Sequence, residues 1–230
     1  MNNNFFTIGK SVVNFCEPDS YIMGMGEPYN VLSSFVILLF GLNGLYNINC
    51  KFKNPNNILT TNKKKCSNIL YGLLCCIGMG SMYFHYELSQ FAHWVDIIFI
   101  SIILVYSQYI LLSKKNQLTK KFNYICLLLI HFATSIFIPY FHIFLLFGTG
   151  FSIKKSIENK IELYSLIKKQ SSNILQQNYW IIKKYFSLGL IFWIIDFFGC
   201  WIISPYHIHW LFHILIGYIS YKIIDLVKYL

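Results

Sequence analysis

The chain carries repeated apolar runs that are long enough to cross a bilayer, and these runs limit it to a helical membrane fold. A spanning helix needs roughly 17 to 25 mostly apolar residues. Runs of this kind lie at 30–48, 67–86, 91–112, 122–138, 140–157, 185–203 and 207–227. Hydrophobic residues make up 56% of the 230 residues and charged residues only 12%, which excludes an ordinary soluble domain. We therefore predict one all-α, polytopic domain over residues 1–230, with seven transmembrane helices.

The lysines indicate which loops face the cytosol. They gather in alternate connections, at Lys51, Lys53, Lys63, Lys64 and Lys65, then Lys114, Lys115, Lys120 and Lys121, then Lys154 and Lys155. The intervening connections, near 86–90, 139 and 204–206, contain no lysine. Because cytosolic loops carry the excess of basic residues, the amino terminus is predicted to be lumenal or exterior and the carboxyl terminus cytosolic. Residues 1–29 hold no long apolar run, so the first span is expected to act as the insertion signal.

The stretch 122–153 leaves two topologies open. It has 32 residues and supplies either two slightly short crossings or one long, bent span. Both of its flanks are lysine-rich, which favours an even number of crossings, and Pro139 suits a turn between them. We predict two crossings.

Five side chains capable of hydrolytic or metal chemistry interrupt the apolar runs: Ser81, His85, Asp96, His209 and His213. Polar groups at membrane depth are rare and usually functional. Ser81 and His85 are four residues apart, as are His209 and His213, so each pair shares one helix face. With seven spans, the end of the second and the starts of the third and seventh lie on one side of the bilayer. The five residues are therefore predicted to meet there.

Three histidines around a divalent cation, with one position left open, are typical of catalytic zinc. Asp96 would take a proton from a metal-activated water and later return it to a leaving group. Ser81 has two interpretations, as a hydrogen-bond donor to a bound oxyanion or as a nucleophile, and the first needs fewer assumptions. A lone His-x-x-x-His pair is also compatible with two interfacial histidines.

Other buried polar residues have competing interpretations. Asp196 lies inside an apolar run and either orients a ligand histidine or pairs with a tyrosine or serine of another helix. His93 is an alternative ligand, although its place at a span start favours an interfacial role. The remaining histidines are predicted to be structural: His131, His142 and His207.

Four stretches hold these candidates or the acids before the first span. They read FCEPDSYIMGMGEPYN, GMGSMYFHYELSQFAHWVD, LIFWIIDFFGC and HWLFHILIGYISY. Together they resemble the signature regions of the alkaline ceramidase family. The resemblance implies that His85, His209 and His213 hold zinc, that Asp96 activates water and that Ser81 assists at the metal and the oxyanion. The implied reaction is hydrolysis of the amide of a ceramide to a sphingoid base and a fatty acid.

The opening stretch also resembles a calcium site of that family. Its oxygen ligands would come from Glu17, Asp19 and Glu27, helped by Asn14 and the backbone of Phe15. Asn14 stands where the family usually has an aspartate, and the segment is one residue shorter before Glu27. The alternative is that these acids only satisfy the charge rule of an exterior segment.

Two of the seven cysteines are predicted to pair. Cys16 and Cys200 lie in family-like stretches on the predicted lumenal side, so we predict a disulfide between them. The others lie in spans or on the cytosolic side and are expected to be reduced: Cys50, Cys66, Cys75, Cys76 and Cys126.

The function predicted from the sequence is therefore that of a zinc-dependent, ceramidase-like hydrolase of the endoplasmic reticulum, Golgi or plasma membrane. Its partner would be a membrane lipid, and no nucleic acid or protein partner is implied. One alternative is a related lipid hydrolase, either a lipid-remodelling esterase or an adiponectin-receptor-like protein. Another is a seven-span receptor or transporter with a structural metal, for which a closed coordination shell would be expected.

Overall fold

A computed structural model describes residues 24–51, 61–111, 117–167, 172–198 and 208–227, and this part of the chain is helical almost throughout. The helices are α1 (Pro28–Lys51), α2 (Thr61–Glu87), α3 (Gln90–Leu111), α4 (Gln117–Phe137), α5 (Pro139–Ile167), α6 (Ser172–Phe198) and α8 (His209–Val227). The predicted all-α class is confirmed. Four segments are long and apolar enough to cross a membrane by length and composition: Pro28–Cys50, Asn62–Glu87, Gln90–Leu111 and His209–Val227. The count of seven spans and the orientation of the termini stay predictions.

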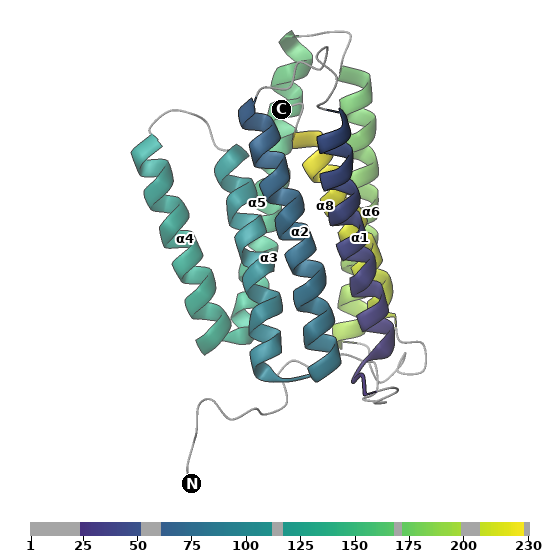
Figure 1. The fold of residues 1–230 in the computed structure, drawn as a ribbon. Helices are drawn as coiled ribbons and strands as arrows, with labels where there is room; N and C mark the ends of the chain where they lie inside the picture. Colours follow the sequence, from purple (N-terminus) through teal and green to yellow (C-terminus); the bar gives the residue numbers. More distant parts are fainter. Residues whose placement is uncertain (1–23, 52–60, 112–116, 168–171, 199–207, 228–230) are drawn as a thin grey trace.

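Six of the helices form a ring, and α4 lies outside it (Figure 1). Around the ring, α1 contacts α2, α2 contacts α3, α3 contacts α5, α5 contacts α6, α6 contacts α8, and α8 returns to α1. Helix α4 packs only on α3 and α5 among the described helices. The ring therefore brings α2, α3 and α8, which carry the candidate site, around one interior.

The stretch 122–153 forms two helices rather than one bent span. Helix α4 ends at Phe137 and α5 begins at Pro139, and the two run in opposite directions in Figure 1. Proline suits the first position of a helix because the amide that it lacks would have no partner within the helix. The predicted helical hairpin is therefore present.

Helices α2, α5 and α6 extend furthest beyond their apolar runs. Helix α2 begins at Thr61 instead of 67, α6 begins at Ser172 instead of 185, and α5 continues to Ile167 instead of 157. The added turns are rich in lysine, glutamate and asparagine, and each extra residue of a helix gains a backbone hydrogen bond. Two side-chain contacts support the added turns of α5 and α6. Lys154 Nζ lies 3.9 Å from Glu158 Oε1, and the hydroxyl of Tyr179 on α6 donates to the same carboxylate. Hydropathy marks only the apolar part of such helices.

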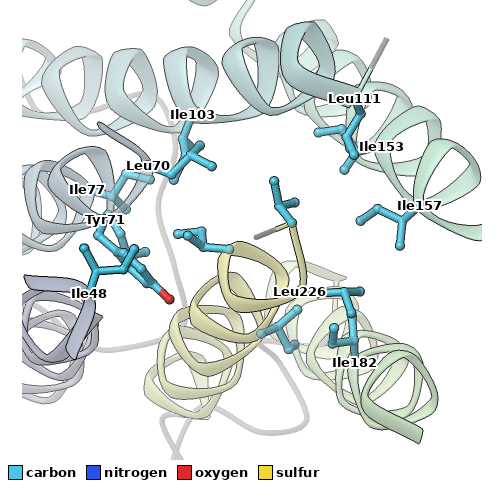
Figure 2. Close-up of a cluster of buried hydrophobic side chains, with 14 of the residues drawn as sticks. Ile48, Leu70, Tyr71, Ile77, Ile103, Leu111, Ile153, Ile157, Ile182 and Leu226 are labelled. Carbon is cyan, nitrogen blue, oxygen red and sulfur yellow. The ribbon is translucent and has the colours of Figure 1, made fainter. Parts of the chain in front are cut away.

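The apolar core fills the end of the bundle opposite the α2–α3 turn. Figure 2 shows this cluster, which includes Ile48 near the end of α1, Leu70 near the start of α2, and Leu111 at the end of α3. Leu226, near the end of α8, belongs to the same cluster. Buried polar residues are left to gather at the other end.

Helices α1 and α2 pack closely because α2 has glycine where they cross. A methyl group added at Gly78 would lie 2.5 Å from the backbone nitrogen of Leu38. Small residues that let two backbones approach are a common device of membrane helix packing. This contact fixes α1 against the helix that carries Ser81 and His85.

Candidate metal centre

A two-residue turn joins α2 to α3 and sets the two helices side by side. Leu88 ends α2 in the left-handed conformation, with φ at 53°, and its N–H donates to the Phe84 carbonyl at 2.7 Å. Ser89 caps α3, since its hydroxyl accepts from the Ala92 N–H at 3.2 Å. About two turns before the end of α2, a methyl group at Gly80 would meet the Asp96 Cα at 3.2 Å. The close approach places Asp96 beside the Ser81 face of α2.

The segment before α1 caps the end of α2. The Gly26 N–H donates to the Tyr86 carbonyl at 3.1 Å, and the Glu27 N–H donates to the His85 carbonyl at 2.9 Å. The last carbonyls of a helix have no partner within it, so these two bonds satisfy groups that the helix itself leaves unpaired. They also bring the Glu27 side chain to His85.

Three buried histidines lie close together at the end of the ring that holds the α2–α3 turn. His85 comes from α2, and His209 and His213 come from adjacent turns of α8. One potential ligand atom from each lies within 4.8 Å of the others. The ring centroids are 4.5 Å apart for His209 and His213, 4.9 Å for His85 and His213, and 5.6 Å for His85 and His209. The structure thus brings together the trio of histidines that was predicted from the sequence to meet.

Each of the first two histidines has a carboxylate at its Nδ1 atom. Glu27 Oε2 lies 2.5 Å from His85 Nδ1, and Asp196 Oδ2 lies 3.0 Å from His209 Nδ1. Both carboxylates are almost fully buried, with 1% and 0% of their surface exposed. Carboxylates in this position fix the tautomer and the ring orientation of metal-binding histidines. Of the two interpretations of Asp196, the geometry agrees with the one in which it orients a histidine.

The third histidine has hydroxyl groups at its Nδ1 atom instead. Ser33 Oγ lies 3.0 Å and Ser34 Oγ 3.1 Å from His213 Nδ1. Because Nδ1 faces a carboxylate or a hydroxyl in all three rings, each histidine keeps Nε2 for a shared ligand.

This donor set fits a divalent cation. Three imidazoles are typical ligands of zinc, and the two carboxylates behind them would balance its charge. Asp96 adds a further feature: it is 9% exposed, and its Oδ1 has no hydrogen-bond partner among the residues that the structure describes. A buried carboxylate oxygen of this kind is costly unless it meets a ligand or a water.

An apolar cavity of about 270 Å³ opens from the histidines into the bundle. Ser81, His85, Asp96, His209 and His213 line one end, and the lining further along is mostly isoleucine, leucine and phenylalanine. On α8 the lining runs from His209 to Ile223, which is roughly 20 Å along a helix axis. The cavity therefore joins the polar histidine cluster to a long apolar chamber.

Other sequence candidates lie elsewhere. His93 also lines the cavity, but it packs on Phe84 with ring centroids 5.0 Å apart and is not a member of the trio. His131 and His142 form a separate buried cluster, in which His131 contacts Thr149 and His142 contacts Thr134 and Ser101; these contacts fit their structural interpretation.

Several predictions fall outside the described residues. These are the calcium ligands Asn14, Phe15, Glu17 and Asp19, the disulfide of Cys16 with Cys200, and His207. Glu27 is the described member of the proposed calcium set, and its carboxylate contacts His85 and the Asn30 side-chain amide, the latter at 2.9 Å. The calcium site stays a prediction. The cysteines expected to be reduced are free thiols: Cys50, Cys66, Cys75, Cys76 and Cys126.

Helix α1 and the residue before it contribute features to the site that were not predicted from the sequence. These are the contact of Glu27 with His85 and the polar residues Asn30, Ser33 and Ser34. Ser33 and Ser34 follow Asn30 by three and four residues, so the three share one face of an otherwise apolar helix. That spacing was a usable signal, because polar residues inside a span usually face the bundle interior.

The fold and the site define an integral membrane protein with a buried histidine cluster at the end of an apolar chamber. The chain belongs to the ceramidase family, whose model, described as Ceramidase, matches residues 8–230. A search of curated proteins found no match. Membership implies a hydrolase that acts on ceramide, a membrane lipid.

Proposed function

We propose that this protein is a zinc-dependent amidohydrolase that cleaves ceramide to a sphingoid base and a fatty acid. The observation that carries the proposal is the buried trio of His85, His209 and His213, each with Nδ1 facing a carboxylate or a hydroxyl, at one end of an apolar cavity. A structural zinc site would be closed by a fourth protein ligand. Among the described residues the cluster has three such ligands, and Asp96 stands beside it.

When bound by the three histidines, zinc would supply Lewis acidity, which makes water a better nucleophile near neutral pH and polarises a carbonyl group. Asp96 then has the position and chemistry of a general base. It would accept a proton from the attacking water and return it to the amine as the carbon–nitrogen bond breaks. Its Oδ1, which has no partner in the described part of the chain, is the atom available for this proton.

Ser81 would act on the carbonyl oxygen of the substrate. Its hydroxyl lines the cavity on the same helix face as His85, four residues away. A donor that meets developing negative charge in a buried site stabilises the transition state strongly. Hydrogen bonding to the oxyanion explains Ser81 without a covalent step.

The chamber suits the hydrocarbon chains of the substrate. Burying methylene groups stabilises a complex by about 0.8 kcal/mol each. The apolar lining would therefore bind a long chain, while the histidine end holds the amide. We expect a long-chain ceramide to be a better substrate than a water-soluble amide.

The test is a lipid assay on the purified protein in lipid nanodiscs. Labelled ceramide and labelled phospholipid are each incubated with the wild type, Asp96→Ala and His213→Ala. We expect fatty acid release from ceramide by the wild type and from neither lipid by the variants. Release from phospholipid alone would keep hydrolytic chemistry but replace the substrate with that of a lipid-remodelling esterase. Release from neither lipid by the wild type would overturn the enzymatic function.

A further inference from the structure

A polar patch on α1 lies behind the candidate catalytic serine. Asn30, Ser33 and Ser34 are buried on the side of α1 that faces α2 and α8. Ser34 Oγ lies 3.0 Å from Ser81 Oγ and 3.1 Å from His213 Nδ1. Ser34 is thus the residue that contacts both a candidate catalytic group and a candidate metal ligand.

Ser33 and Ser34 both contact His213, but they differ in their contact with Ser81. Both hydroxyls are within hydrogen-bond distance of His213 Nδ1, at 3.0 and 3.1 Å, so either could accept its proton. Only the Ser34 hydroxyl has a hydrogen bond to Ser81. Without Ser33, the Ser34 hydroxyl would still accept the proton of His213 Nδ1. Without Ser34, the hydrogen bond from α1 to Ser81 would be lost.

The Ser34 hydroxyl has two acceptors within reach of its one proton. A histidine that binds a metal through Nε2 carries its proton on Nδ1 and can only donate there, so His213 is not one of them. The two are the Asn30 carbonyl, at 2.7 Å, and Ser81 Oγ, at 3.0 Å. The Asn30 carbonyl is also within reach of the helical N–H of Ser34 and of the Ser33 hydroxyl, 3.0 Å away, so it keeps donors when the Ser34 proton is directed at Ser81.

The direction of this bond matters because Ser81 has one proton. If Ser34 donates to Ser81, the Ser81 proton stays available to the cavity. If Ser81 donated to Ser34 instead, only its lone pairs would face the substrate, and it could not stabilise an oxyanion. Ser81 lines the cavity and Ser34 does not, so Ser34 can act only through Ser81 or His213.

We propose that Ser34 is a positioning residue that donates its hydroxyl proton to Ser81 and thereby directs the Ser81 proton at the carbonyl oxygen of the substrate. This inference rests on the proposed function, because it assigns a partner to the serine of that site. It also assigns Ser33 as sufficient for holding His213 when Ser34 is absent.

The test is a double-mutant cycle in the purified protein. Ser34→Ala, Ser81→Ala and the double variant are compared with the wild type for kcat and KM on ceramide and for zinc content. We expect Ser34→Ala to lower kcat on the order of 10-fold or more with KM changed by less than about 3-fold, since an oxyanion donor is worth about 10²–10³ in rate. In the Ser81→Ala background, Ser34→Ala should cause no further loss, because a residue that acts through another has no separate effect. Both single variants should keep the wild-type zinc content.

Additional variants separate a positioning role from a structural one. Ser34→Thr, which restores a hydroxyl, should recover most of the lost kcat. Ser135→Ala removes a similarly buried serine of α4, whose hydroxyl donates to the Phe132 carbonyl of its own helix and contacts no residue of the candidate site in the described part of the chain, and it should leave kcat unchanged. Ser33→Ala combined with Ser34→Ala should lose zinc to a chelator faster than either single variant.

The possible failures are distinguishable. Equal losses from Ser34→Ala in the wild-type and Ser81→Ala backgrounds would overturn the role of Ser34, as would loss of zinc in proportion to activity. A wild type that does not hydrolyse ceramide would overturn the proposed function together with this inference. An active wild type with additive losses would overturn the inference alone.

Discussion

Glu27 Oε2 lies 2.5 Å from Nδ1 of His85, although the two residues are 58 positions apart in the chain. The contact depends on backbone bonds that join the residues before α1 to the end of α2. Because Glu27 is almost fully buried, its charge cannot be screened by water and acts directly on the imidazole. A candidate metal ligand of α2 is thus oriented by the entry to α1.

The charge of Glu27 should strengthen metal binding. Glu27→Gln keeps a side chain of the same size but replaces the carboxylate with an amide. We expect zinc affinity to fall by roughly 10- to 100-fold, as is typical when the partner of a metal-binding histidine is lost. Competition with a chromogenic chelator measures the change. The exposed Glu87, at the end of α2, provides the matched control, and an equal loss in Glu87→Gln would show that general surface charge is responsible.

Replacing Asp96 should lower kcat without loss of zinc, whereas replacing His213 should lower both. Asp96→Asn should keep one zinc per chain and lower kcat by about 10²–10⁴-fold, because it removes the general base and none of the three histidines. His213→Ala should lose both zinc and turnover, since it removes one of three ligands. Metal analysis and the ceramide assay are run on the same samples. A zinc-free Asp96→Asn protein would mean that Asp96 binds the metal.

Zinc should also stabilise the fold. A ligand that binds only the folded state adds about 4 kcal/mol when it is present at 1,000 times its dissociation constant. Chelation should therefore lower the midpoint of thermal unfolding, and added zinc should restore it. His213→Ala should show no such shift. An unchanged midpoint of thermal unfolding of the wild type after chelation would argue against a buried metal.

The crossing of α1 and α2 should tolerate no added methyl group at Gly78. The backbone of Leu38 is in the way, and overpacking typically costs about 1–3 kcal/mol. Gly78→Ala should therefore lower the free energy of unfolding in a detergent titration. Gly72→Ala on the same helix is the control, because a methyl group there meets nothing within 4 Å and alanine favours the helix. Equal stability of the two variants would contradict the packing described here.

Helical periodicity and bilayer length were sufficient to predict the helices and the convergence of His85 with His209 and His213, because residues four apart share a face and alternate helix ends share a side. The α4–α5 hairpin was predicted from the lysines on both sides of 122–153 and from Pro139. The ends of α2, α5 and α6 were not predictable from hydropathy, since those turns are polar. The contact of Glu27 with His85 was missed because it depends on the capping bonds of Gly26 and Glu27, which no periodic pattern records.

The most direct test of the proposed metal centre is X-ray absorption at the zinc edge of the purified protein, together with its zinc content. We expect one zinc per chain, bound by three imidazole nitrogens at about 2.0–2.1 Å and by one further nitrogen or oxygen ligand that is not an imidazole. The variants His85→Ala, His209→Ala and His213→Ala should each lose this zinc signal. A protein without zinc, or zinc held by cysteine sulfur at about 2.3 Å, would contradict the proposed metal centre.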